Sequence, residues 1–101
     1  MEPTKLKDLL SLQKLIQEIH NWAGNPTIGL IALEEAVKAR EKLKTYKVTL
    51  YMIEGLDPWF NIIDGALHNI ITNDLSVDYK RRLEMLTLEF DKEIEYFIKN
   101  S

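Results

Sequence analysis

Apolar side chains recur at steps of three and four residues along most of this 101-residue chain. That spacing places them on one face of an α-helix, which has 3.6 residues per turn. Polar breaks interrupt the pattern at residues 23–26, 54–58 and 72–76, and each break combines residues that end helices with residues that begin them. The pattern predicts one all-α domain over residues 1–101, folded as an antiparallel four-helix bundle.

The breaks define predicted helices over about residues 4–23, 26–53, 57–71 and 76–99. Gly24 and Gly55 can adopt the left-handed conformation that closes a helix. Asp57 before Pro58 is typical of an N-cap followed by the first helical residue. Residues 46–53 also have a strand-like composition, but a single strand would lack a partner, so helix is the preferred interpretation.

The predicted helix over residues 26–53 carries a heptad pattern, with small residues in its first half and large residues in its second. Its positions are Gly29, Ala32, Ala36, Ala39, Leu43, Tyr46, Leu50 and Ile53. The small residues allow close approach of another helix, either within the chain or from a second copy, so the oligomeric state stays open.

Trp59 and Phe60 stand together at the start of the third predicted helix. On a helical wheel both lie in the apolar half, with Trp59 near its middle. Burial of aromatic side chains dominates small cores, so core packing is favoured over recognition as the reason for this pair.

Composition excludes several classes of function. The chain has no cysteine, which removes disulfides, thiolate metal sites and cysteine nucleophiles. Its net charge of −3 gives no general reason to expect nucleic-acid binding. The first residues lack a signal-peptide core, and no apolar run reaches the roughly 20 residues of a membrane span. A cytoplasmic protein is expected, with peripheral membrane contact allowed.

Neither histidine has the companions that a metal site needs. His68 follows Asp64 by four residues on a polar helical surface, and His20 lies at the rim of the first helix. Most acids of the last helix are expected to be solvated, and Glu93, at the border of the core stripe, is the one candidate for partial burial, with a salt bridge across the bundle as the alternative. No catalytic residue, metal or cofactor is predicted, and the chain is not expected to be an enzyme.

One enzyme class is an alternative to this view. The segment LQKLIQEIHNWAGNP is similar to the opening helix of all-helical nucleoside-triphosphate pyrophosphohydrolases. Those enzymes bind magnesium through Glu-x-x-Glu, whereas Glu34 and Glu35 are followed three residues later by Val37 and Lys38. Without those carboxylates the metal site cannot form.

The last helix has two faces. Its core stripe consists of Tyr79, Leu83, Leu86, Phe90, Ile94 and Phe97. A second stripe brings together apolar and cationic residues and is a predicted docking surface, with Lys80 and Arg82 steering a partner toward it. The contact residues of that stripe are Arg81, Met85, Leu88, Lys92 and Tyr96. The alternative, that a neighbouring helix covers Met85 and Leu88, stays open.

The order of these features resembles the immunity proteins of pediocin-like (class IIa) bacteriocins, in the enterocin A immunity group. An opening helix reads LQKLIQEIHN and ends at NP, and a charged helix contains ALEEAVKAREKLK. A turn at LDP precedes NIIDGALHNI, and the break ITNDLS precedes YKRRLEMLTLEF. The resemblance implies a cytoplasmic four-helix bundle that protects the producing cell. It also implies a partner at the membrane, the mannose phosphotransferase permease with bound bacteriocin, and specificity in the C-terminal half.

Two functions are therefore expected. The first is a bacteriocin immunity protein that binds a receptor–bacteriocin complex from the cytoplasmic side and blocks the pore. The alternative is a small helical adaptor or inhibitor from a phage or mobile element, which would use the same surface for a different protein.

Overall fold

A computed structural model describes residues 2–25, 31–72 and 77–100 of the chain. All regular secondary structure among these residues is helical. The helices are α1 (Pro3–Ala23), α2 (Ile31–Lys44), α3 (Lys47–Tyr51), α4 (Trp59–Thr72) and α5 (Val77–Lys99). The all-α prediction is confirmed, and so is helix rather than strand at residues 47–51. The predicted first residues of the second and fourth helices, Pro26 and Ser76, lie outside the described residues.

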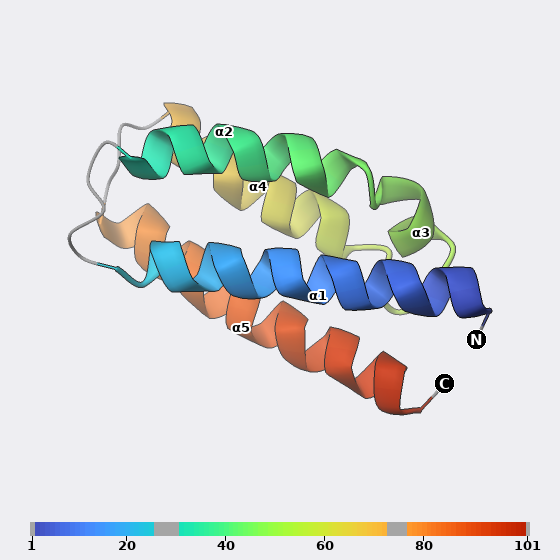
Figure 1. Ribbon diagram of the computed structural model, residues 1–101. Helices are drawn as coiled ribbons and strands as arrows, with labels where there is room; N and C mark the ends of the chain where they lie inside the picture. Colours follow the sequence, from blue (N-terminus) through green and yellow to red (C-terminus); the bar gives the residue numbers. More distant parts are fainter. Residues whose placement is uncertain (1, 26–30, 73–76, 101) are drawn as a thin grey trace.

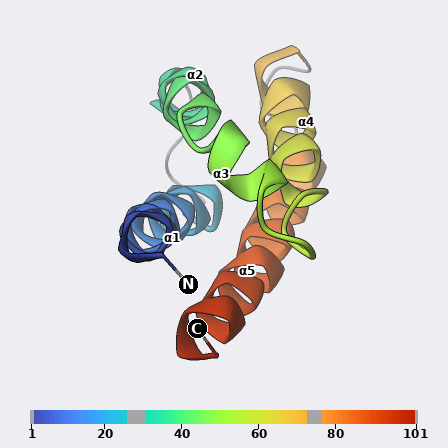
Figure 2. The ribbon, with the colours of Figure 1, turned by 90° about the vertical axis from the view of Figure 1, so that its right-hand side faces the viewer.

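The four longer helices lie side by side (Figure 1). Helix α1 packs against α2 and α5, and α4 packs against the same two helices from the other side. The start of α1 and the end of α5 lie at the end of the molecule where α3 is found (Figure 1). Figure 2 shows α3 at that end, between α2 and α4.

The core lies where the apolar stripes of these helices meet. In α1, six apolar residues at steps of three and four are buried, namely Leu9, Leu12, Leu15, Ile16, Ile19 and Ala23. Phe60 is buried as predicted, and Trp59 packs against the core with its ring stacked on Phe90 at a centroid distance of 5.0 Å. The helical wheel therefore placed Phe60 correctly in the buried half of α4, whereas Trp59, predicted near the middle of that half, is only half-buried.

The single helix predicted over residues 26–53 is wrong, because α2 ends at Lys44. The Thr45 hydroxyl donates to the carbonyl oxygen of Lys42 at 2.7 Å, and the amide of Tyr46 donates to Leu43 at 3.0 Å. These bonds to residues three positions back replace the four-residue spacing of an α-helix. Helix α3 then begins, and its Thr49 hydroxyl donates to Asp8 of α1 at 3.0 Å. The described part of the chain thus has five helices, not four.

The heptad pattern nevertheless identified the inward residues on both sides of this break. Ala36, Ala39 and Leu43 of α2 are buried, and so are Leu50 and Ile53 after the break. Tyr46 is half-buried and packs against the same core. The chain therefore changes direction without turning its apolar face toward solvent.

The two glycines expected to close helices behave differently. Gly55 has a φ of 98°, the left-handed conformation predicted for it, whereas Gly24 has a φ of −81° and is right-handed. A Cβ atom on Gly55 would also lie 3.0 Å from the Phe97 ring. Glycine is therefore favoured at position 55 for two reasons: the left-handed backbone conformation and the lack of space for a Cβ atom beside Phe97.

We expect the substitution Gly55→Ala to lower the free energy of unfolding by about 1–2 kcal/mol, because a Cβ atom disfavours the left-handed backbone. Gly65 is the matched control, since a Cβ atom there meets nothing within 4 Å inside α4. Gly65→Ala should raise the stability by about 0.5–1 kcal/mol. Urea denaturation of the two variants measures both changes, and equal effects would contradict this account of Gly55.

Candidate functional site

The inward face of α5 determines which of its residues face outward. Leu83, Phe90 and Ile94 are fully buried, as the sequence predicts. Thr87 is also fully buried, and its hydroxyl donates to the carbonyl oxygen of Leu83 at 2.8 Å, so that this polar group is satisfied inside the core. The opposite side of α5 is consequently directed away from the bundle.

The predicted contact residues of α5 lie on that outer side, and we call them the α5 stripe: Arg81, Met85, Leu88, Lys92 and Tyr96. Met85 is 67% exposed, Leu88 42% and Tyr96 61%. None of the described helices covers Met85 or Leu88, so the alternative left open by the sequence does not hold for the described part of the chain. Tyr96 is supported from below by Phe97, whose ring it meets edge to face at 5.7 Å.

The cations of this surface are bound weakly or not at all within the described chain. Arg81 and Arg82 are exposed and form no ion pair with any described residue. Lys92 pairs with Glu89 at 3.8 Å, and more than half of each side chain is exposed. Exposed pairs of this kind contribute little, about 0–1 kcal/mol, so a partner can replace them at small cost.

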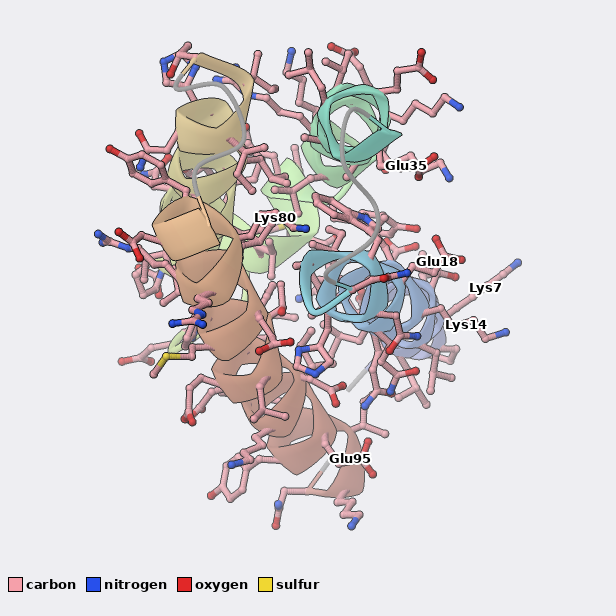
Figure 3. All side chains as sticks on the ribbon, turned by 90° about the vertical axis from the view of Figure 1, so that its left-hand side faces the viewer. Lys7, Lys14, Glu18, Glu35, Lys80 and Glu95 are labelled. Atoms are coloured by element: carbon pink, nitrogen blue, oxygen red, sulfur yellow. The ribbon has the colours of Figure 1, made fainter. Side chains whose placement is uncertain are left out.

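Lys80 differs from the other predicted cations because the fold itself uses it. Its side chain reaches from the first turn of α5 toward α1 (Figure 3), where the ammonium group donates to the carbonyl oxygen of Asn25 at 2.9 Å. A cation near the C-terminal end of α1 also stabilises the helix dipole. Lys80 therefore joins the ends of two helices, and its charge is only partly available for steering a partner.

A row of polar contacts between α1 and α5 was not predicted. Gln13 donates to Glu95 at 2.6 Å, and Gln17 donates to Asp91 at 3.3 Å. One turn further along, His20 Nδ1 lies 2.9 Å from the carbonyl oxygen of Glu84. Because a carbonyl oxygen only accepts, Nδ1 carries the hydrogen. These contacts fix the rotation of α5 against α1.

The acids of α5 were expected to be solvated with the exception of Glu93, and this expectation is wrong for four of them. Glu84, Asp91 and Glu95 are half-buried at the α1 seam, whereas Glu93 is exposed. Glu93 lies on the other flank of α5, where no described helix accepts it. The sequence spacing gave the face of each acid but could not show which face α1 would cover.

His68 and Asp64 are joined by a residue from another helix. Arg40 of α2 contacts both Asp64 carboxylate oxygens, at 2.8 and 3.3 Å, and its Nη1 donates to His68 Nδ1 at 3.1 Å. The hydrogen bond to Asp64 is the main cause that raises the pKa of Arg40. This group links α2 to α4, and among the described residues no three potential ligands gather to hold a metal ion.

Comparison with protein-family models, with curated proteins and with solved structures finds no match to this chain. Among the described helices, none combines the length and apolar character needed to cross a bilayer. The α5 stripe is an open row of apolar and cationic side chains on a helix whose opposite face packs against α1 and α4.

We expect the double substitution Met85→Asp, Leu88→Asp to change the free energy of unfolding by no more than about 1 kcal/mol, since both side chains are exposed and only helix propensity is lost. Leu83→Ala, two residues before Met85 on the buried face, should cost about 2–5 kcal/mol. Thermal and urea denaturation measure both. Unfolding of the double variant would mean that the stripe belongs to the core.

Proposed function

We propose that this chain is an immunity-type binding protein that acts against a pediocin-like bacteriocin. In this proposal α2 and α3 together form the second member of an antiparallel four-helix bundle. The observation that carries the proposal is the open α5 stripe, which lies in the half of the chain where the resemblance expects specificity. Blocking requires a rigid surface and no catalytic group, and the stripe supplies such a surface.

The proposed partner is a receptor–bacteriocin complex, approached from the cytoplasmic side of the membrane. Met85, Leu88 and Tyr96 supply apolar contact area, and the exposed Arg81 and Lys92 supply charge at its margin. Apolar and aromatic groups at the centre of an interface usually provide most of the affinity, while charges accelerate and orient the approach. Arg82 assists this steering, and Lys80 contributes mainly by holding the first turn of α5 in place.

The proposal is tested by producing the protein in a bacteriocin-sensitive strain and challenging the cells with a panel of pediocin-like peptides. The unmodified protein should protect against at least one peptide. The Met85→Asp, Leu88→Asp variant should lose that protection while accumulating normally, because it keeps the fold and loses the apolar centre of the stripe.

A matched control is available in α3 and at the residue that follows it, where two apolar side chains are exposed. Val48 is 69% exposed and Met52 60%, and neither belongs to the stripe. The Val48→Asp, Met52→Asp variant should still protect. Absence of protection by the unmodified protein against every peptide would reject the immunity function. The alternative function would then remain, in which the chain is an adaptor or inhibitor that binds another protein through the α5 stripe.

A further inference from the structure

The break between α2 and α3 lies beside a groove on the opposite side of the molecule from the α4–α5 contact. The groove runs between α1 and the end of α2 and has a volume of about 230 Å³. Its polar lining residues come from α1 and from the residues around the break, and they are Ser11, Lys14, Glu18, Lys42, Thr45 and Tyr46. A continuous helix over residues 26–53 would not place Thr45 and Tyr46 in a turn at this position.

Two cations border the groove from different helices. Lys14 comes from α1 and Lys42 from α2, and neither forms an ion pair with any described residue. Hydroxyl groups of Ser11 and Tyr46 add further donors. The Thr45 hydroxyl donates its hydrogen bond to the backbone carbonyl oxygen of Lys42, so toward a ligand its oxygen can act only as an acceptor. Four residues that carry donor groups, Ser11, Lys14, Lys42 and Tyr46, therefore line the groove.

One acid adds a second kind of contact. Glu18 lies one turn beyond Lys14 on the same side of α1 (Figure 3) and also forms no ion pair with a described residue. Its carboxylate can accept a hydrogen bond from a ligand hydroxyl group. Between the polar groups, the buried side chain of Leu15 forms an apolar floor.

The groove fits a small ligand better than a peptide. Its volume lies below the range of about 300–1,000 Å³ that is typical of sites for drug-sized molecules. A second cavity between α1 and α2, near Trp22, has a volume of only about 20 Å³. Lys38, which lines it, pairs with Glu35 at 4.0 Å. Lys42 lines both cavities of the seam, whereas Lys14 lines only the one at the α3 end.

We propose that this groove binds the phosphate ester of a small hydroxylated molecule. The phosphate group lies between Lys14 and Lys42 and receives hydrogen bonds from Ser11 and Tyr46, while a ligand hydroxyl group donates to Glu18. The two negative charges of a phosphate dianion balance the positive charges of two ammonium groups, one from each helix. Its oxygens can also accept hydrogen bonds from several donors at once. This inference is independent of the α5 stripe and of its proposed partner.

The test is a titration of the full chain with glycerol 3-phosphate, followed through the amide signals of ¹⁵N-labelled protein at constant ionic strength. Saturable shifts are expected at Ser11, Lys14, Thr45 and Tyr46, with little change along α5. Glycerol should produce no shift, and inorganic phosphate should bind more weakly because it lacks the hydroxyl contact with Glu18. Glycerate that binds as tightly as glycerol 3-phosphate would overturn the assignment of a phosphate.

Two double variants provide the matched comparison. Lys14→Ala, Lys42→Ala removes both cations of the groove and should weaken binding at least tenfold. Lys7→Ala, Lys44→Ala removes the same charge from exposed positions that do not line the groove, and it should leave the affinity within twofold. Tyr46→Phe should keep the fold and weaken binding by a smaller factor. Equal affinity in both double variants, or shifts that sodium sulfate reproduces, would overturn the proposal.

Discussion

The placement of α5 between α1 and α4 is the constraint on which the outer surface depends. On one side the Phe90 ring stacks on Trp59, with an interplanar angle of 8°. On the other side, the amides of Gln13 and Gln17 contact Glu95 and Asp91 of α5, and the imidazole of His20 contacts the carbonyl oxygen of Glu84 about two turns earlier. Apolar stacking alone would permit α5 to rotate or slide by a fraction of a turn, whereas directional hydrogen bonds favour one register. The orientation of the α5 stripe follows from both contacts together.

The buried faces could be predicted because a period of 3.6 residues relates sequence to one side of a helix directly. This worked for Leu83, Phe90 and Ile94 of α5 and on both sides of the break at Thr45, and in α4 it worked for Phe60 but not fully for Trp59, which is half-buried. The break itself was missed because the heptad pattern continues through it without glycine or proline. What ends α2 is local competition, in which the Thr45 hydroxyl and the Tyr46 amide bond to residues three positions back. Neighbouring Val48 and Thr49, which are β-branched, reduce the helix propensity further.

Residues of the α5 stripe could likewise be named from the wheel, but the contacts of charged residues could not. Glu84, Asp91 and Glu95 differ from Glu89 and Glu93 only in the flank of α5 that they occupy. Which flank meets α1 depends on how three helices pack, and one helix's sequence does not contain that information. Lys80 shows the same limit, since its partner is a backbone carbonyl group 55 positions away in the sequence.

The break also explains how a small bundle can carry two separate surfaces. Buried Leu50 and Leu56 close the core at the α3 end, so α2 does not need to continue along α1 to that end. The residues that leave the helix there, Thr45 and Tyr46, line the α1–α2 groove, while the α5 stripe lies on a different helix and shares no residue with it. A helix of uninterrupted length would have packed along α1 with its polar side chains in solvent. Because α2 ends early, Thr45 and Tyr46 line one side of the groove, and the contacts that orient α5 are formed by other residues.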